Sequence, residues 1–160
     1  MVYTFLKTKG YNTGKNYVEE DKLDYCRELL DKYPDKIILS KDAYSLVDNR
    51  KVYKDITNLN SDDECFDIGE KTVELFKEYL EKSKTIFING PFGLFEDDNF
   101  SDGSKSICNL LKSLNSDIYA GGGETTYMLN KFNVNNVFLS TGGGATLTYL
   151  SSGKLNGIIE

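Results

Sequence analysis

The sequence contains no histidine, and this absence removes the commonest general base at neutral pH. Nucleophilic sites that pair a serine or a cysteine with histidine are excluded with it. The three cysteines, Cys26, Cys65 and Cys108, stand at wide spacing, with no CxxC pair and no histidine to complete a zinc site. We therefore predict free thiols in a reducing cytoplasm, and a chemistry that depends on positioning and electrostatics.

An excess of basic charge and a long apolar run are also missing. The 19 basic residues are scattered among 25 acidic ones, for a net charge of −6, so no basic stripe is present that could bind a nucleic-acid backbone. No apolar run approaches the roughly 20 residues that span a bilayer, and Met1 does not open a basic and apolar leader. We expect a cytoplasmic protein that has neither nucleic acid nor a membrane as its partner.

The first third of the chain predicts a helix and a strand. With 160 residues, 39% of them hydrophobic, the chain suits one packed domain. Apolar positions at spacings of three and four predict a helix over 18–33, with Asn16 and Glu19 as a capping box. The apolar run 37–39 predicts a strand that is buried on both faces. Residues 43–64 form either an irregular excursion or a short edge strand around Val52.

The rest of the sequence alternates between helical and strand patterns. Helices are predicted over 73–80 and 107–114, between the last two strands and from about Ala145, and strands over 85–88, 118–120 and 137–139. Such alternation favours parallel strands joined by right-handed crossovers. The sequence therefore predicts an α/β fold of the Rossmann-like class, with three layers and a mostly parallel sheet that has helices on both faces.

Glycine-containing turns follow three of the four predicted strands. They are Asn89-Gly90-Pro91-Phe92-Gly93, Gly121-Gly122-Gly123-Glu124 and Thr141-Gly142-Gly143-Gly144. Because parallel strands end at the same edge of a sheet, the three turns are expected together. Glycine lets backbone N–H groups approach anionic oxygens, and the next helix adds its dipole. A single triplet is more often only a tight turn, but three on one edge favour a phosphate site.

Three polar residues flank these turns, and each has two interpretations. Glu124 is either a first-turn acid stabilised by the helix dipole or a Mg²⁺ ligand beside a phosphate. Glu96 is either a solvated loop acid or an acceptor for ribose hydroxyls. Asn89 either closes a turn or contacts a ligand through its amide. The residues by themselves leave these alternatives open.

The same turns carry a resemblance to a known family. Residues 87–96 resemble the Asn-Gly-Pro-x-Gly-x-Phe-Glu segment of phosphoglycerate kinases, 121–125 their Gly-Gly-Gly-Asp-Thr/Ser turn and 140–145 their Ser-Thr-Gly-Gly-Gly-Ala. Residues 4–6, 18–22 and 67–72 resemble the upstream Thr-Phe-Leu, Glu-Glu-Asp-Lys and Asp-Ile-Gly-Pro-Lys-Thr stretches. The resemblance implies that residues 1–160 are a partial, carboxy-terminal nucleotide-binding domain, without the amino-terminal phosphoglycerate-binding domain.

The resemblance also implies a reaction and a set of site residues. The reaction is the glycolytic transfer of a phosphoryl group between ATP and 3-phosphoglycerate, with Mg²⁺ and no covalent intermediate, which agrees with the absence of histidine. The implied residues are Asn89, Pro91 and Glu96 on the nucleotide, with Glu96 at the ribose; Gly121, Gly122, Gly123 and Thr125 along its phosphates; Glu124, where the family has aspartate, at the metal; and Gly142, Gly143 and Gly144, as the catalytic group, at the transferring phosphoryl.

The expected partners follow from the same resemblance. They are ATP or ADP, and 3-phosphoglycerate only where an amino-terminal domain is supplied. Loss of the earlier strands would expose a sheet edge and an apolar face, which favours self-association or a partner chain. Three functions stay open: one half of a kinase that is active with a second chain, a nucleotide-binding module without catalysis, or an interaction remnant whose glycine turns are only turns.

Overall fold

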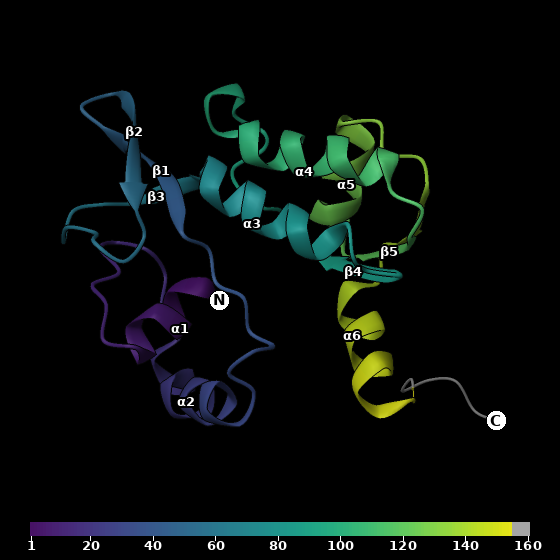
Figure 1. Cartoon of the computed structure of the whole chain (residues 1–160), viewed down its shortest axis with the longest axis horizontal. Coiled ribbons are helices and arrows are strands. Elements are labelled where there is room, and N and C mark those ends of the chain that lie inside the picture. The colour runs from purple at the N-terminus through teal and green to yellow at the C-terminus, as the bar shows by residue number, and fades with distance from the viewer. Residues whose placement is uncertain (155–160) are drawn as a thin grey trace.

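Two three-stranded sheets and six α-helices make up residues 1–154, the part of the chain that the computed structural model describes (Figure 1). One sheet is antiparallel, with the order β2-β1-β3; its strands are β1 (Asp42–Val47), β2 (Arg50–Asp55) and β3 (Cys65–Ile68). The other is parallel, with the order β4-β5-β6; its strands are β4 (Thr85–Asn89), β5 (Asp117–Gly121) and β6 (Val137–Ser140). The helices are α1 (Val2–Thr8), α2 (Leu23–Lys32), α3 (Glu70–Leu80), α4 (Asp102–Ser113), α5 (Gly123–Lys131) and α6 (Gly143–Ser152). The predicted α/β fold is confirmed.

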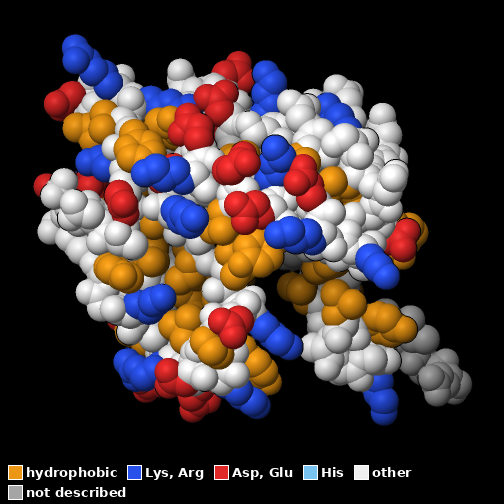
Figure 2. Space-filling model, in the orientation of Figure 1, with side chains coloured by type: hydrophobic (Ala, Val, Ile, Leu, Met, Phe, Trp, Pro, Cys, Tyr) orange, Lys and Arg blue, Asp and Glu red, His pale blue; other side chains and the backbone are white. Residues whose placement is uncertain are grey.

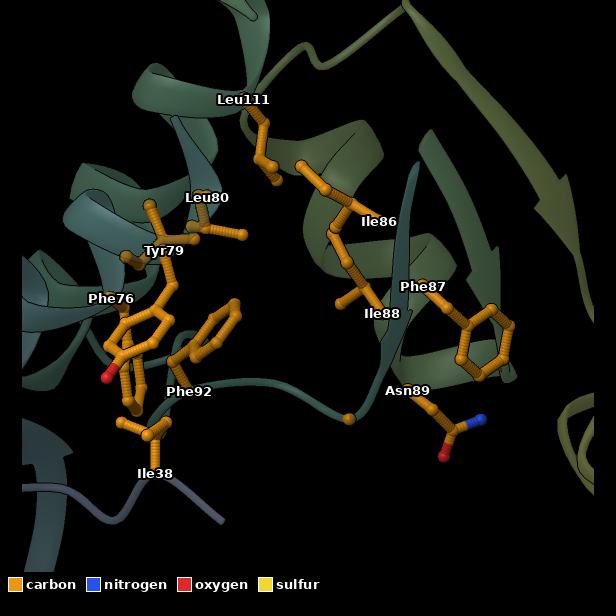
Figure 3. A pocket seen from close by; sticks show the side chains of 12 residues that line it. Ile38, Phe76, Tyr79, Leu80, Ile86, Phe87, Ile88, Asn89, Phe92 and Leu111 are labelled. Atoms are coloured by element: carbon orange, nitrogen blue, oxygen red, sulfur yellow. The ribbon is translucent and has the colours of Figure 1, made fainter. Parts of the chain in front are cut away.

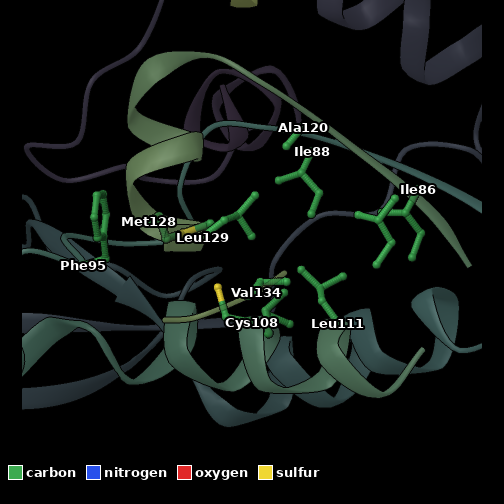
Figure 4. Close-up of a cluster of buried hydrophobic side chains, with 11 residues drawn as sticks. Ile86, Ile88, Phe95, Cys108, Leu111, Ala120, Met128, Leu129 and Val134 are labelled. Atoms are coloured by element: carbon green, nitrogen blue, oxygen red, sulfur yellow. The ribbon is translucent and has the colours of Figure 1, made fainter. Parts of the chain in front are cut away.

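The main core lies on one face of the parallel sheet. Side chains alternate along β4, so Ile86 and Ile88 point into the core with Ile118 of β5 (Figure 4). They pack against Leu111 of α4 and Leu129 of α5, and each such side chain contributes about 1.5–3 kcal/mol when it is fully buried. This apolar contact fixes α4 and α5 against the sheet, and α5 begins at the second glycine turn.

The opposite face of the parallel sheet is covered only in part. Helix α6 lies on this face, away from α4 and α5 (Figure 1). The exposed fractions of Phe87, Tyr119 and Phe138 are nevertheless 37%, 44% and 68%. The prediction of helices on both faces is confirmed, but the second helical layer consists of one short helix among the described residues.

Two buried aspartates join the antiparallel sheet to the helices of the parallel one. The carboxylate of Asp42, in β1, accepts hydrogen bonds from the backbone N–H groups of Lys71 (3.0 Å) and Thr72 (2.8 Å) at the start of α3. The carboxylate of Asp67, in β3, accepts one from the N–H of Gly103 (2.9 Å) at the start of α4. Both carboxylates satisfy donors that a helix leaves unpaired and lie at the positive end of its dipole.

The predicted strand at 37–39 is wrong. These residues are half-buried and adopt no regular secondary structure. Ile38 lies at the mouth of an apolar groove beside β4 (Figure 3), but the described sheets contain no strand that pairs with it. These residues are less buried than the apolar run predicted, and a strand also needs a backbone partner, which they lack among the described residues.

The segment 43–64 is more regular than expected. Val52 does lie in an edge strand, β2, but β2 forms a hairpin with β1, which the sequence analysis missed. The turn is made by Asp48 and Asn49, both at positive φ (49° and 58°). Asp and Asn tolerate this conformation better than other non-glycine residues, and two such residues suit a hairpin.

The amino-terminal helices also differ from the prediction. The helix expected over 18–33 begins only at Leu23, after a 3-10 turn at Glu20–Lys22, and α1 was not predicted. The expected capping box is absent, because the Asn16 side chain donates to the Thr13 carbonyl (2.8 Å) and accepts from the N–H of Cys65 (2.9 Å). Asn16 therefore makes tertiary hydrogen bonds and does not form the helix cap that its local sequence pattern predicted.

Candidate functional site

The three glycine turns leave the parallel sheet side by side. In the register of the sheet Asn89 pairs with Gly121, and Gly121 pairs with Ser140. Each strand ends at or beside one of these residues, and α5 and α6 begin within three residues of the ends of β5 and β6. The prediction that the turns share one edge is confirmed.

The second and third turns are in direct backbone contact. A Cβ placed on Gly143 would lie 2.8 Å from the Cα of Gly122 and 3.4 Å from the amide nitrogen of Asn89. The N–H of Gly122 donates to the carbonyl of Ser140 (2.9 Å), and Gly122 has a φ of +99°. The amino-terminal ends of α5 and α6 therefore meet, and their dipoles bring two positive ends to one place.

Asn89 joins the first turn to the second. Its side-chain N–H donates to the carbonyl of Gly121 at 3.0 Å, and a Cβ on Gly121 would approach the same nitrogen to 3.1 Å. The amide thus closes the turn, one of the two interpretations that the sequence allowed. Its side chain is exposed at the edge where the turns meet.

Thr125 makes a second connection between these turns. Its hydroxyl accepts a hydrogen bond from the N–H of Gly90 at 2.7 Å, and its exposed fraction is only 1%. Gly90 has a φ of +108°, a conformation that side chains rarely adopt. In this structure Thr125 holds the β4 turn against the first turn of α5.

The helix starts also present open backbone. A Cβ on Gly123 or on Gly144 would meet no atom within 4 Å, and both residues are exposed. Gly142, which precedes α6, is exposed as well. The first N–H groups of a helix have no intrahelical acceptor. The N–H of Gly143 donates to the Thr141 carbonyl (3.1 Å), whereas no such bond is described for Gly123 and Gly144, so these two offer donors to an anion.

Glu124 lies exposed in the first turn of α5, beside this open backbone. Residues 1–154 contain no group of three or more acidic or cysteine side chains that could hold a metal ion by themselves. Mg²⁺ nevertheless often has only one or two carboxylate ligands from the protein, and its other ligands are waters and substrate phosphates. The residues therefore fit a metal that arrives with a phosphate ligand.

The loop Gly90–Phe100 carries the remaining predicted residues, Pro91 and Glu96. Pro91 is half-buried and Glu96 is exposed. The loop is fixed at Leu94, whose N–H donates to the Phe66 carbonyl (2.7 Å). Sequence analysis missed these fixing contacts, because they come from segments distant in the chain and no local pattern reports them.

An apolar groove lies beside β4, on the side away from β5. Its volume is about 370 Å³, and Figure 3 shows Ile86 and Ile88 on one wall with Phe76 and Phe92 on the other. The groove reaches the first glycine turn at Asn89, Gly90 and Phe92. It offers packing surface, whereas the donors for an anion lie at the glycine turns.

Comparison with known proteins identifies this arrangement. The family model for phosphoglycerate kinase matches residues 1–154. The chain belongs to the phosphoglycerate kinase family. The chain is 39% identical to the phosphoglycerate kinase of Lactobacillus delbrueckii subsp. bulgaricus over 164 residues and to that of Staphylococcus haemolyticus over 172 residues, in each case with 99% of this chain covered.

Solved phosphoglycerate kinases have the same fold over nearly the whole chain. The enzyme from Coxiella burnetii matches with a TM-score of 0.87 and 32% identity, and that from Pyrococcus horikoshii with 0.84 and 26%, each over 96% of this chain. The matched part is 41% of the Lactobacillus protein and 42% of the Coxiella one. The chain therefore spans about two fifths of the length of these phosphoglycerate kinases.

Proposed function

We propose that this chain binds Mg·ADP and Mg·ATP as the nucleotide-binding half of a phosphoglycerate kinase. The observation that carries the proposal is the contact of Gly122 with Gly143, which brings the amino-terminal ends of α5 and α6 together at the strand ends. Two helix ends with open backbone donors suit a chain of phosphates, and the family membership supplies the nucleotide. Transfer of the phosphoryl group to or from 3-phosphoglycerate requires a second domain that holds the acid.

The residues divide into those that bind the nucleotide and those that hold the turns. Gly121 to Gly123 lie along the phosphates, and Gly142 to Gly144 present N–H groups to the transferring phosphoryl. Asn89, Pro91 and Glu96 contact the rest of the nucleotide, with Glu96 at the ribose. Thr125 supports the site through its hydrogen bond to Gly90.

Glu124 is the proposed metal contact. Its carboxylate would hold Mg²⁺ beside the nucleotide, and the ion would supply positive charge that neutralises the phosphates. The chain's own groups then position the phosphates, and no protein side chain has to act as a nucleophile. Glutamate reaches about one bond length further than the aspartate that the family has at this position.

Thermal unfolding with and without Mg·ADP tests the proposal. A ligand that binds only the folded state stabilises it by about 1.4 kcal/mol at a concentration of ten times its dissociation constant. We expect the midpoint to rise with Mg·ADP, and to rise less in Glu124→Ala. A midpoint that millimolar Mg·ADP leaves unchanged would contradict the proposal.

A coupled kinase assay then separates catalysis from binding alone. Binding without turnover, in the presence of an added amino-terminal half of a phosphoglycerate kinase, would identify a nucleotide-binding module. Turnover that depends on the added half would identify a working half-enzyme.

A further inference from the structure

Helix α5 contacts the loop Gly90–Phe100 at both of its ends. At the amino-terminal end, the Thr125 hydroxyl accepts from the N–H of Gly90 (2.7 Å). At the carboxy-terminal end, the Lys131 ammonium group donates to the carbonyl of Phe95 (2.7 Å). Between them the ring of Tyr127 packs edge-on against that of Phe95, with 5.6 Å between the ring centres. The conformation of the loop is therefore fixed to the helix that begins with the second glycine triplet.

Phe95 and Lys131 together fix the residue that follows, Glu96. The exposed fraction of Phe95 is 1%, so its side chain is anchored in the core. The Phe95 carbonyl and the Glu96 N–H belong to one planar peptide unit, and the hydrogen bond from Lys131 holds that plane. The plane sets the direction of the N–Cα bond of Glu96, from which the side chain leaves the backbone after one further rotation, φ.

The remaining contacts of Lys131 are weaker. Its ammonium group lies 3.8 Å from the Asp98 carboxylate, whose side chain is almost fully exposed, so solvent screens this pair. A lysine in the last turn of a helix also interacts favourably with the helix dipole. The ammonium group also lies over the Phe132 ring, 5.7 Å from its centre. None of these interactions orients a particular peptide, whereas the hydrogen bond to Phe95 does.

We propose that Lys131 is a positioning residue for nucleotide binding, which acts by orienting Glu96 toward the ribose. This inference rests on the proposed function and deepens it. Lys131 lies seven residues after Glu124 on α5, about 10 Å along the helix axis. One helix would then set both ends of the site, with its first turn at the phosphates and its last turn holding the loop of the ribose contact.

Calorimetric titration of the full chain with ADP and with inorganic pyrophosphate, both with Mg²⁺, tests the inference. Pyrophosphate has no ribose and so needs only the glycine turns. In Lys131→Met we expect ADP affinity to fall about tenfold, as for other residues that orient a ligand-binding group, and pyrophosphate affinity to stay unchanged. Lys131→Arg should retain most of the ADP affinity, because it keeps a donor at this position.

Two controls connect the effect to Glu96. Lys82→Met removes an exposed lysine for which no hydrogen bond or ion pair is described, and it should leave both affinities unchanged. In Glu96→Ala, which removes the proposed ribose acceptor, the further change Lys131→Met should cost little, because both act through one contact. Equal losses for ADP and pyrophosphate, or additive effects of the two changes, would overturn the inference.

Amide hydrogen exchange tests the same contact without a nucleotide. Lys131→Met should speed exchange at the amide of Asp97, which follows Glu96 and donates to the Leu94 carbonyl (3.1 Å), while exchange in the core strand β5 stays slow. Unchanged exchange at Asp97 would overturn the inference. If wild-type protein binds neither ADP nor pyrophosphate, the proposed function fails, and faster exchange at Asp97 would then support only the contact between Lys131 and the loop.

Discussion

At the scale of a single residue, a substitution at Gly123 should weaken ligand binding without affecting folding. Because a Cβ on Gly123 would meet nothing within 4 Å, Gly123→Ala should fold as the parent does. The added methyl group would stand where the phosphates approach the backbone, so the stabilisation by Mg·ADP should shrink. Thermal unfolding with and without Mg·ADP measures both effects.

Asn130→Ala is the matched control, because it lies on the same helix in an exposed position at the far end. It should keep the whole shift that Mg·ADP produces. An undiminished shift in Gly123→Ala would contradict the assignment of this residue to the phosphates.

Asp67 gives the chain a pH dependence. Burial raises the pKa of its carboxyl from 3.8 to about 6. The backbone N–H groups of Gly103 and Ile68 and the charge of Lys51 lower this pKa, and the charge of Asp102 raises it, but burial has the largest effect. The folded state therefore binds the proton more tightly than the unfolded state does, so this group makes unfolding easier as the pH rises from about 4 to about 6. The slope is at most about 1.4 kcal/mol per pH unit.

Asp67→Asn removes this titration. The free energy of unfolding of wild-type protein should fall relative to that of Asp67→Asn across this pH window, as urea unfolding at several pH values would show. The exposed Asp31 supplies the control, since Asp31→Asn should leave the slope unchanged. A difference between wild type and Asp67→Asn that rises with pH would contradict the sign.

At the scale of elements, substitutions at two neighbouring glycines, Gly143 and Gly144, test the contact between α5 and α6. Gly143→Ala would place a methyl group 2.8 Å from the backbone of Gly122, which cannot move without displacing α5 or α6. We expect a loss of about 1–3 kcal/mol and a weaker effect of Mg·ADP. Gly144→Ala, one residue along, meets no atom within 4 Å and should cost no stability.

Chemical denaturation of the two variants measures the difference. Equal stability of Gly143→Ala and Gly144→Ala would mean that the ends of the two helices do not touch in solution.

The helices and strands that could be predicted from sequence are those whose residues are apolar because they are buried. The strands β4, β5 and β6 are apolar, uncharged in their centres and followed by glycine, so they can be recognised without knowledge of their tertiary contacts. The hairpin of β1 and β2 was missed because β2 has no fully buried residue and carries Arg50, Lys51 and Lys54, which weaken a strand pattern. The predicted capping box failed because Asn16 bonds to distant residues.

In the candidate site, the glycine turns could be predicted from sequence and the contacts that hold them could not. Its glycine turns are contiguous in sequence and lie at the ends of recognisable strands. The hydrogen bond of Thr125 to Gly90 and that of Lys131 to Phe95 join residues 35 and 36 positions apart, and no local pattern predicts such pairs.

At the scale of the whole molecule, large hydrophobic side chains are exposed on several of the described elements. Phe138 and Tyr119, on the sheet face that α6 covers only in part, are exposed, as is Leu150 of α6. Figure 2 shows hydrophobic side chains on the projecting helix α6. Exposed apolar patches such as this one on α6 and the parallel sheet mark contact surfaces. None of the helices in residues 1–154 has the length and hydropathy to span a bilayer.

We expect the chain to self-associate through this face. Sedimentation velocity should show species larger than a monomer, and Phe138→Lys should shift the distribution toward monomer because it places a charge in the patch. Tyr25→Lys, on the exposed side of α2, is the control and should change nothing. A compact wild-type monomer would exclude this expectation.

The central claim is that the glycine turns of this chain bind the phosphates of a nucleotide. The most direct test is a titration of ¹⁵N-labelled protein with Mg·ADP, followed through the backbone amide resonances of Gly122, Gly123, Gly143 and Gly144. We predict saturable shifts at these four amides, with the core strands unaffected. Shifts that avoid these four amides, or no shifts at millimolar Mg·ADP, would contradict the claim.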